Sequence, residues 1–509
     1  MRAFVLGSSA NELVCAILLA KQGHDVTVLE MGAQLGGTGA LREICRGFRA
    51  PVSPEHWVAP AVARAVGLDV GTGWNEASVT VLGAREPLTL SSGLARSRAA
   101  IAKRSAADEG KLEAFATRMA RLAGFLESLY VEEPPRLMSE QAGDLFSLMA
   151  VGLRLRRLGK VDMIELLRTL PMSVSDLLDD WFEDDALKAA IGLGGVTNLL
   201  QGPRSAGTCF VMLHHLVGRP IGGFGARRAV RGERDHLVGA LVGIAKSAGV
   251  KLRVEVEARV LVEDGRAVGV TVDGKEERGE VVVSGGDPKT TFSRWVDPTE
   301  LEPETVRAVG NVKLRGVRAV VNLAVGALPK FGVDEAALSG VLSNAAHLDF
   351  IERAYDDAKH GSISKKPVFE VTIPSIHDSS LAPEKKHVVS VAVQWVPHRL
   401  KNGTWDREAF GDRVVAMLDE LAPGLAGSVE GRAVWGPSEL EAEYGLREGH
   451  LYGGELTLDQ ILFMRPFPGH AHYRSPIEGL FMCGDACHPG GALPGLAGVS
   501  AGREITRGA

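Results

Sequence analysis

The first forty residues alternate between apolar runs and polar breaks in the order of a βαβ unit. Residues 3–6 form a short continuous apolar run, which predicts a strand buried in a parallel sheet. After a turn at residues 7–10, apolar residues recur at helical spacing up to Gly23, which suits a helix C-terminus. Residues 25–29 predict a second strand that ends at Glu30. An acid about 20 residues beyond such a turn is placed to accept hydrogen bonds from the ribose of a dinucleotide.

The turn carries only part of the glycine fingerprint that such a site normally has. Where the pattern reads G-x-G-x-x-G, this chain has Gly7, Ser9 and Glu12. The second glycine lets the backbone approach the pyrophosphate, and the third allows close packing of helix on strand. Serine is small enough to be tolerated, whereas a glutamate crowds the packing and adds negative charge beside the phosphates. The alternative is an ordinary βαβ unit with a serine-rich turn.

The middle of the chain changes from helical to extended periodicity. Residues 94–130, 235–248 and 413–421 predict helices, and residues 145–158 predict an amphipathic helix with a cationic end. That last helix either faces the core or lies on a membrane surface and admits a lipid-soluble substrate. Segments rich in β-branched residues predict a meander at residues 250–256, 258–262 and 267–272, a buried strand at 281–284, and a second sheet from 317–325, 368–373 and 388–396.

The C-terminal segment contains a second pattern that indicates a cofactor. Residues 479–485 predict a strand that ends in Gly484 and Asp485, followed by a glycine-rich turn and a run of small residues, 492–502, that becomes a helix. The acid can accept a hydrogen bond from a ribityl hydroxyl, and helix N–H groups can stabilise charge on a reduced flavin ring. Together with the N-terminal unit, this pattern predicts a flavin; the alternative is a glycine-rich strand-to-helix turn.

Composition and charge narrow the class of protein. A chain of 509 residues exceeds what one hydrophobic core usually holds, and 45% hydrophobic with 24% charged residues is typical of globular proteins. The net charge of −6 argues against a nucleic-acid surface. Five scattered cysteines without a C-x-x-C motif argue against a disulfide framework or a redox dithiol. With no run of about 20 apolar residues and no signal-like start, we expect a cytoplasmic protein, soluble or peripheral to the membrane.

No pair of residues stands out as a general acid and base, so the sequence nominates no catalytic residue. His214, His215, His488 and Tyr473 are only candidates. Adjacent histidines on a helix point about 100° apart and ligate one metal poorly, so no metal site is expected.

Segments spread over nearly the whole chain resemble one family, at residues 28–37, 182–190, 202–205, 283–292, 351–359, 369–374, 453–461 and 479–491. It is that of the phytoene-dehydrogenase-related FAD-dependent oxidoreductases, close to the bacterial relatives of the pyridine nucleotide-disulphide oxidoreductase domain-containing protein. The resemblance implies an α/β fold: a Rossmann-like FAD-binding domain of the glutathione-reductase and amine-oxidase type, with an inserted α+β substrate domain. The FAD domain would comprise residues 1–90, 225–300 and 430–509, and the substrate domain 91–224 and 301–429.

The resemblance also implies which residues would hold FAD. The pyrophosphate would face Gly7, Ser8, Ser9 and Asn11, and the adenosine ribose would face Glu30, with Met31 next to it in the chain. The flavin would lie along Gly36 and Gly37, and the adenine would meet Val256 or Glu257. The ribityl–phosphate arm would be held by Gly484 and Asp485, and the flavin ring would lie near Gly495, Leu496 and Ala497.

Departures from the family pattern gather at the nucleotide end. Besides Ser9 and Glu12, the stretch 229–237 lacks the usual glycine-rich motif, and Glu257 stands where valine is common. Three hypotheses follow. The first is an FAD-dependent oxidoreductase acting on a hydrophobic, isoprenoid- or lipid-like substrate by hydride transfer; oxygen or quinone would be its electron acceptor, since no second dinucleotide fingerprint follows a strand. The second is a flavin-less lipid-binding or chaperone protein, and the third an amine-oxidase-like enzyme.

Overall fold

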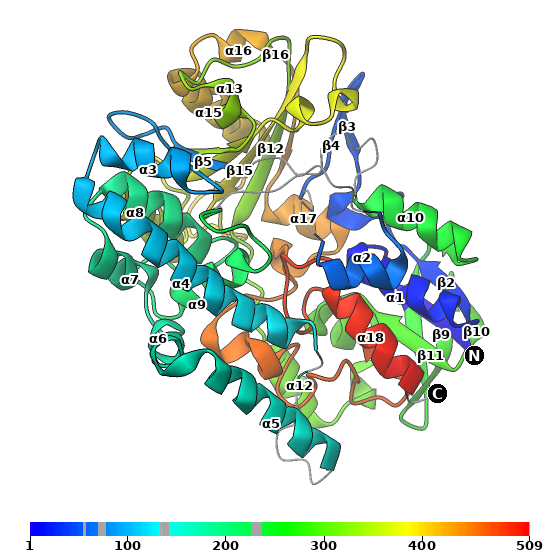
Figure 1. The fold of residues 1–509 in the computed structure, drawn as a ribbon. Coiled ribbons are helices and arrows are strands. Elements are labelled where there is room, and N and C mark those ends of the chain that lie inside the picture. The colour runs from blue at the N-terminus through cyan, green and yellow to red at the C-terminus, as the bar shows by residue number, and fades with distance from the viewer. Residues whose placement is uncertain (54–57, 70–77, 133, 135–141, 225–236, 508–509) are drawn as a thin grey trace.

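The computed structural model describes residues 1–53, 58–69, 78–132, 134, 142–224 and 237–507, and it is organised around three main sheets (Figure 1). The stretch 229–236, where the family pattern is lost, lies outside the described residues. The first sheet has the strand order β17-β11-β1-β2-β7, and each neighbouring pair is parallel. Its strands are β1 (Arg2–Leu6), β2 (Asp25–Leu29), β7 (Lys251–Arg253), β11 (Val281–Ser284) and β17 (Leu480–Met482).

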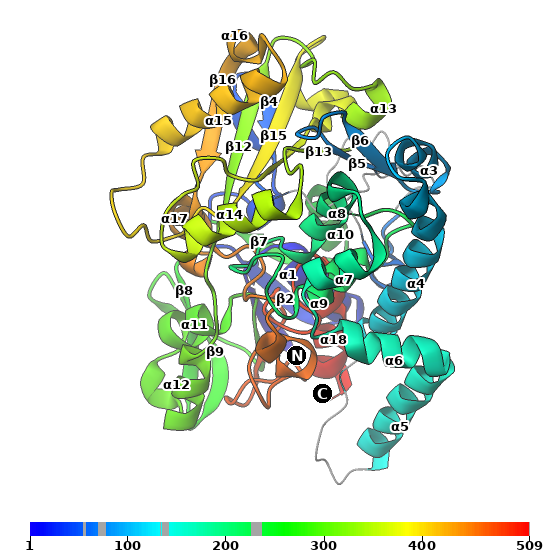
Figure 2. The same cartoon turned by 90° about the vertical axis from the view of Figure 1, so that its left-hand side faces the viewer.

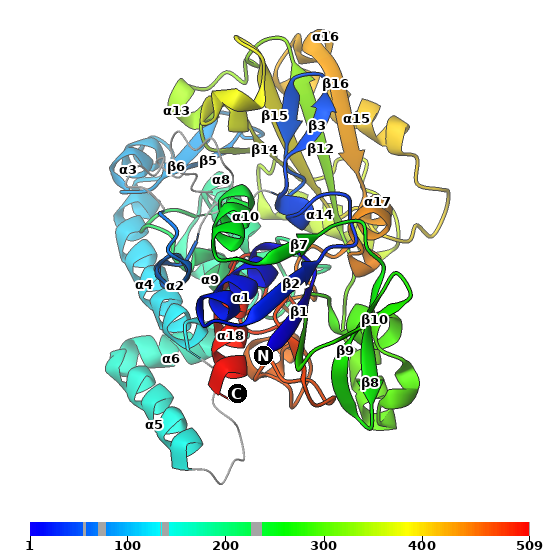
Figure 3. The same ribbon diagram turned by 90° about the vertical axis from the view of Figure 1, so that its right-hand side faces the viewer.

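Three helices pack together on this sheet (Figure 3). They are α1 (Ala10–Lys21), α10 (Leu237–Ser247) and α18 (Leu496–Arg507). The backbones of α1 and α18 touch, because a Cβ on Gly498 would lie only 2.1 Å from the carbonyl oxygen of Asn11. The glycine that permits a close approach to α1 is therefore supplied by α18, whereas position 12 of α1 carries a glutamate.

The predicted βαβ start and buried strand 281–284 are confirmed, and the predicted meander is wrong in its first strand. The segment 251–253 pairs in parallel with β2 and so extends the first sheet. A separate antiparallel sheet, in the order β10-β9-β8, is formed by β8 (Ala258–Glu263), β9 (Arg266–Val272) and β10 (Lys275–Arg278). Local periodicity detects strands, but which strand they pair with depends on contacts distant in sequence.

The predicted second sheet is confirmed and is larger than expected. It has seven strands in the order β16-β12-β15-β14-β13-β5-β6, and it lies at the far end of the molecule from α5 (Figure 2). Its strands are β5 (Ser78–Val81), β6 (Leu88–Ser91), β12 (Arg318–Val325), β13 (Val341–Ser343), β14 (Phe369–Thr372), β15 (His387–Gln394) and β16 (Val429–Trp435). A two-stranded hairpin, β3 (Arg42–Cys45) and β4 (Phe48–Ala50), lies beside it.

The helix predicted over residues 94–130 is two helices. Helix α3 (Ala95–Ala102) ends before Ser105, whose hydroxyl accepts a hydrogen bond from the N–H of Asp108 and so caps α4 (Ala106–Tyr130). The remaining helices of the described chain are α2 (Pro60–Val66), α5 (Ala142–Arg157), α6 (Gly159–Thr169), α7 (Val174–Trp181), α8 (Asp185–Gly192), α9 (Thr208–Leu216), α11 (Pro288–Thr290), α12 (Pro303–Gly310), α13 (Glu335–Leu338), α14 (Leu348–Lys359), α15 (Arg407–Leu421), α16 (Leu425–Ser428) and α17 (Pro437–Tyr444).

None of the helices within the described ranges has both the length and the apolar character needed to cross a bilayer.

Candidate cofactor-binding site

Four parallel strands of the first sheet end at the same edge and leave their following residues around one cavity. Gly7 follows β1, Glu30 follows β2, Gly285 follows β11, and Asp485 comes three residues after β17. All four line a cavity of about 330 Å³. Ligands of open α/β sheets bind at this carboxyl edge, where the connections leave a crevice.

Two of the loops at this edge touch each other and therefore require glycine. Gly7 has a φ of +101°, a conformation that side chains with a Cβ rarely adopt. A Cβ on Gly484 would lie 2.0 Å from the carbonyl oxygen of Gly285, so the turns after β11 and β17 are in direct backbone contact. These glycines keep the edge of the sheet narrow.

Glu30 is held in place by donors from its own loop and from the first turn. The hydroxyl of Ser8 donates to Oε2 of Glu30 at 2.5 Å, and the N–H of Gly32 donates to Oε1 at 2.7 Å. The N–H of Gly36 in turn donates to the Ser8 hydroxyl at 2.8 Å. Each carboxylate oxygen keeps a further lone pair, so Glu30 can still accept from the hydroxyls of a ribose.

Asp485 is joined to the start of α1 through an amide. The side-chain N–H of Asn11 donates to Oδ1 of Asp485 at 2.8 Å, and the N–H of Gly498 donates to the amide oxygen of Asn11 at 3.3 Å. Burial raises the pKa of Asp485 to about 6, although the nearby Arg465 and the Asn11 hydrogen bond oppose that rise. At neutral pH this carboxyl is therefore mostly ionised, and both of its oxygens can accept hydrogen bonds from ribityl hydroxyls.

Glu12 determines whether the nucleotide end fits a pyrophosphate. Its side chain is 2% exposed, contacts the Ser9 hydroxyl, and fills the space above Gly285, where a Cβ would meet Oε1 at 2.2 Å. Burial, with the charges of Asp485 and Glu30, raises the pKa of Glu12 to about 8. A mostly neutral carboxyl at pH 7 removes the repulsion that the sequence predicted. The edge thus fits a dinucleotide with a mostly neutral carboxyl at position 12.

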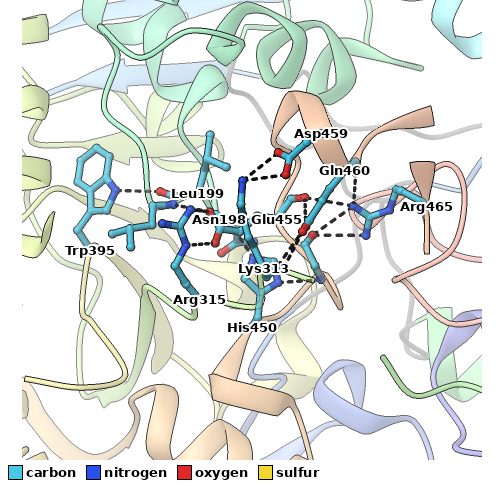
Figure 4. A network of polar contacts seen from close by, with 12 residues as sticks. Asn198, Leu199, Lys313, Arg315, Trp395, His450, Glu455, Asp459, Gln460 and Arg465 are labelled. Atoms are coloured by element: carbon cyan, nitrogen blue, oxygen red, sulfur yellow. Dashed lines mark hydrogen bonds and ion pairs between the residues drawn. The ribbon is translucent and has the colours of Figure 1, made fainter. Parts of the chain in front are cut away.

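Arg465 holds together loops that contribute residues to the cavity wall, through a network of hydrogen bonds (Figure 4). The guanidinium is 2% exposed, and all its hydrogen bonds go to main-chain carbonyls. Burial lowers the pKa of Arg465 to about 10, so it stays charged. The cation ties the turn after β17 to the loop that follows α17. The carbonyl oxygens that accept from it belong to Tyr452, Gly454, Glu455, Gln460, Asp485 and Ala486.

An ion pair between the buried Glu455 and the partly exposed Arg315 continues this network (Figure 4). Glu455 is fully buried and binds Arg315 through two hydrogen bonds of 2.5 and 2.8 Å. The imidazole of His450 donates to the carbonyl of Asn198 at 3.2 Å and accepts from backbone N–H groups on its other nitrogen. Burial lowers the pKa of His450 to about 3, so this cavity-lining ring is neutral.

The residues predicted to hold FAD fall into three groups. Those that line the cavity are Gly7, Ser8, Ser9, Glu30, Met31, Gly37 and Asp485. Those that do not line it but contact residues that do, or adjoin them in the chain, are Asn11, Gly36, Val256 and Gly484; the N–H of Val256 donates to the carbonyl of Glu30 at 3.3 Å. The rest lie elsewhere: Gly495, Leu496 and Ala497 are at the start of α18, packed toward α1 and α2, and the Glu257 side chain is 75% exposed beside Arg259.

Several lining residues were not predicted as part of the site. They belong to the turn after β11, to a set of arginines, and to the loop after α17. The turn after β11 could have been predicted, because two glycines and an acid at residues 285–287 follow a buried strand, as Gly7 follows β1. No sequence pattern predicted the arginines or the loop after α17 as part of the site. They include Gly285, Gly286, Asp287, Arg42, Arg294, Arg447, His450 and Gly453.

The four side chains considered for catalysis are engaged in packing between elements. His214 is fully buried, with its two ring nitrogens within 3.1 Å of the Tyr130 hydroxyl and 2.8 Å of the Gly491 carbonyl oxygen. His215 bonds the Gly194 carbonyl oxygen at 2.8 Å, and the Tyr473 hydroxyl donates to the carbonyl of His488 at 3.1 Å.

The histidines among them share one protonation state. Burial lowers the pKa of His214 to about 3 and that of His215 and His488 to about 4, so all three are neutral at physiological pH. Through His214 and His488, α9 and α4 are joined to the loop that contains residues 488–491.

Comparisons with known proteins place a dinucleotide-binding unit at the start of the chain and identify its relatives. A family described as "NAD(P)-binding Rossmann-like domain" matches residues 5–66, which contain the end of β1 and all of α1 and β2. Pyridine nucleotide-disulfide oxidoreductase domain-containing protein 2 of Rattus norvegicus is 29% identical over 540 residues, covering 99% of this chain and 93% of that protein. The 4,4'-diapolycopen-4-al dehydrogenase of Metabacillus indicus is 23% identical, covering 97% and 94%.

Among solved structures, wild-type putrescine oxidase bound to putrescine superposes with a TM-score of 0.62 at 16% identity, covering 100% of this chain and 99% of that one. At this identity the likeness shows the fold alone, an α/β fold with a Rossmann-like dinucleotide-binding unit. A Fusarium fujikuroi phytoene desaturase is 25% identical over about half of each chain, 52% and 48%. The chain is thus a homologue of the pyridine nucleotide-disulfide oxidoreductase domain-containing proteins and of the phytoene-desaturase-like FAD-dependent oxidoreductases.

Proposed function

We propose that this protein is an FAD-dependent oxidoreductase that acts on a hydrophobic, isoprenoid- or lipid-like small molecule in a desaturation, saturation or isomerisation. The observation that supports it most is the cavity at the carboxyl edge of the first sheet, which Glu30, Asp485 and Gly453 line together. FAD bound there would supply the hydride acceptor or donor at its flavin ring, while the protein orients the reactants and excludes water.

The proposed roles of the residues follow from their positions. Gly7, Ser8, Ser9 and Asn11 would contact the pyrophosphate through the turn and the start of α1, and Glu30 the adenosine ribose. Asp485 would accept hydrogen bonds from the hydroxyls of the ribityl arm. Its side chain is held by Asn11, and its main-chain carbonyl accepts a hydrogen bond of 2.9 Å from Arg465. Among the other predicted residues, Met31 and Gly37 line the cavity and Gly36, Val256 and Gly484 adjoin it, so these five would complete the site, whereas Glu257, Gly495, Leu496 and Ala497 do not line it.

We propose that the FAD domain comprises residues 1–90, 225–300 and 430–509, and the substrate domain 91–224 and 301–429. The strands of the first sheet support this division, since they come from residues 2–29, 251–284 and 480–482. At the end of the first segment, β5 and β6 are themselves strands of the seven-stranded sheet, where β5 pairs with β13.

The substrate class rests on the relatives. The names of two of them refer to 4,4'-diapolycopen-4-al and to phytoene. We propose a substrate of similar apolar character for this chain, with oxygen or a quinone as the electron acceptor, because the sequence contains no second dinucleotide fingerprint after a strand.

We further propose that α5 and α6 rest on an anionic phospholipid surface. The two helices extend from one end of the molecule (Figures 1 and 3). They expose Met149, Leu153, Val161, Ile164 and Leu167, each at 50% or more. The exposed cations Arg156, Arg157 and Lys160 lie at the junction of the two helices and complement anionic headgroups.

Vesicle flotation tests this contact. Wild type should float with phosphatidylglycerol vesicles, and V161E/I164E should lose most of that binding. The control V306E changes an exposed apolar side chain of α12 and should float like wild type. Equal flotation of V161E/I164E and wild type would refute the contact.

The test of the main proposal is the absorbance spectrum of the purified protein, with denaturing release to identify the flavin. About one equivalent of FAD, bleached anaerobically by an isoprenoid or lipid substrate, is the expected result. The buried Glu12 favours one alternative, a flavin-less protein that binds a lipid in the same fold. A colourless protein that does not take up added FAD would refute the oxidoreductase and leave that alternative.

A further inference from the structure

Glu12 occupies a position where a side chain and a phosphate compete for space. It is the third residue of α1, on the first turn of the helix, and α1 begins at the carboxyl edge of the sheet. Phosphates bind at such helix N-termini because the N–H groups there have no partners within the helix. The Glu12 carboxyl lies on the cavity wall at this end of α1, against Ser9.

The side chain has little freedom to leave this place. Its Cγ would be 3.5 Å from a Cβ on Gly7, and its Oε1 2.2 Å from one on Gly285, so it is wedged between the turns after β1 and β11. It is 2% exposed. A ligand that binds at this edge therefore meets the carboxyl where it stands.

The charged groups around Glu12 make a negative charge at this position unfavourable. Glu30 at the end of β2 and Asp485 after β17 are both acids, and the thiols of Cys483 and Cys487 are the titratable groups near it on the side of β17. Its own element contributes the neutral Ser9 hydroxyl. The cation nearest Asp485, Arg465, already donates its hydrogen bonds to carbonyls. Burial is the largest cause of the raised pKa of Glu12, about 8.

We propose that Glu12 links dinucleotide binding to its own protonation: the carboxyl with its proton donates a hydrogen bond and admits the pyrophosphate, and the ionised carboxyl excludes it. This inference rests on the proposed function, since it concerns the FAD site. Binding of FAD to the ionised form takes up one proton, and the affinity falls as the pH rises through the titration of this group. Loading of the cofactor is therefore sensitive to pH on the alkaline side of neutrality.

The experiment titrates flavin-free, full-length protein with FAD from pH 6 to 9.5 and follows the quenching of flavin fluorescence. For wild type we expect a constant Kd up to about pH 7 and a rise that approaches tenfold per pH unit above about pH 8. E12Q keeps the size and the hydrogen-bond donor but no longer titrates, so its Kd should be flat. E12G should also be flat and should bind more tightly than wild type above pH 8.

Calorimetry in two buffers of different ionisation enthalpy gives a second readout, because wild type should take up close to one proton per FAD at pH 9 and E12Q none. The control E300Q changes an exposed acid outside the site and should reproduce the wild-type curve. If E12Q keeps the wild-type pH dependence, the proton linkage is refuted while the FAD site stands. If wild type, E12Q and E12G all fail to bind FAD at every pH, both the linkage and the proposed function are refuted.

Discussion

Replacing Arg465 with lysine tests whether this buried cation holds the loops beneath the cavity. The guanidinium donates to six carbonyl oxygens at distances from 2.9 to 3.4 Å. A lysine has three N–H donors on a compact head, so at least three carbonyls lose a charged donor. Leaving a buried acceptor unsatisfied costs about 1–3 kcal/mol. Since several of the contacts are long, we expect R465K to lose about 3–5 kcal/mol of unfolding free energy.

Thermal unfolding measures this loss. For a chain of 509 residues the unfolding entropy is about 1 kcal/mol/K, so the Tm should fall by about 3–5 °C. The control is Arg503→Lys on the exposed side of α18, for which we expect less than 1 °C. A Tm for R465K within 1 °C of wild type would show that the loops hold their shape without the guanidinium.

Three further predictions concern buried groups. The folded state keeps a proton on Glu12 that the unfolded chain releases above its ordinary pKa of 4.5, so the stability of wild type falls as the pH rises from 4.5 toward 8. In urea unfolding, the unfolding free energy of E12Q minus that of wild type should therefore be about 3 kcal/mol larger at pH 7 than at pH 4. An equal difference at both pH values would contradict this. Trp395→Phe removes the 2.9 Å hydrogen bond from Nε1 to the Leu199 carbonyl at a fully buried position, and should cost about 2 kcal/mol in the same assay; no loss would mean that the site repacks. A double-mutant cycle on Glu455 and Arg315 should give a coupling of about 1–2 kcal/mol, below that of a fully buried pair because Arg315 is 43% exposed, and zero coupling would show that the pair contributes only through packing.

Local patterns in the sequence carried the prediction of the parallel core and of the two ends of the site. Residues 3–6, 25–29 and 281–284 are short segments rich in apolar residues, and each is followed by a glycine or an acid. A strand buried on both faces is mostly apolar, and the chain leaves its carboxyl end at the ligand crevice. For the same reason Glu30 and Asp485 could be predicted as lining residues without knowing how the chain folds between them.

The tertiary structure decided what the acids do. From the sequence, Glu12 adds a negative charge beside the phosphates; in the fold it is buried between Gly7 and Gly285, and burial changes its protonation. Arg465 could not be related to the site from the sequence, because its partners are carbonyls of loops whose positions only the fold determines. Periodicity records which face of an element is buried, whereas pKa values and hydrogen-bond networks depend on groups that are distant in the chain and adjacent in space.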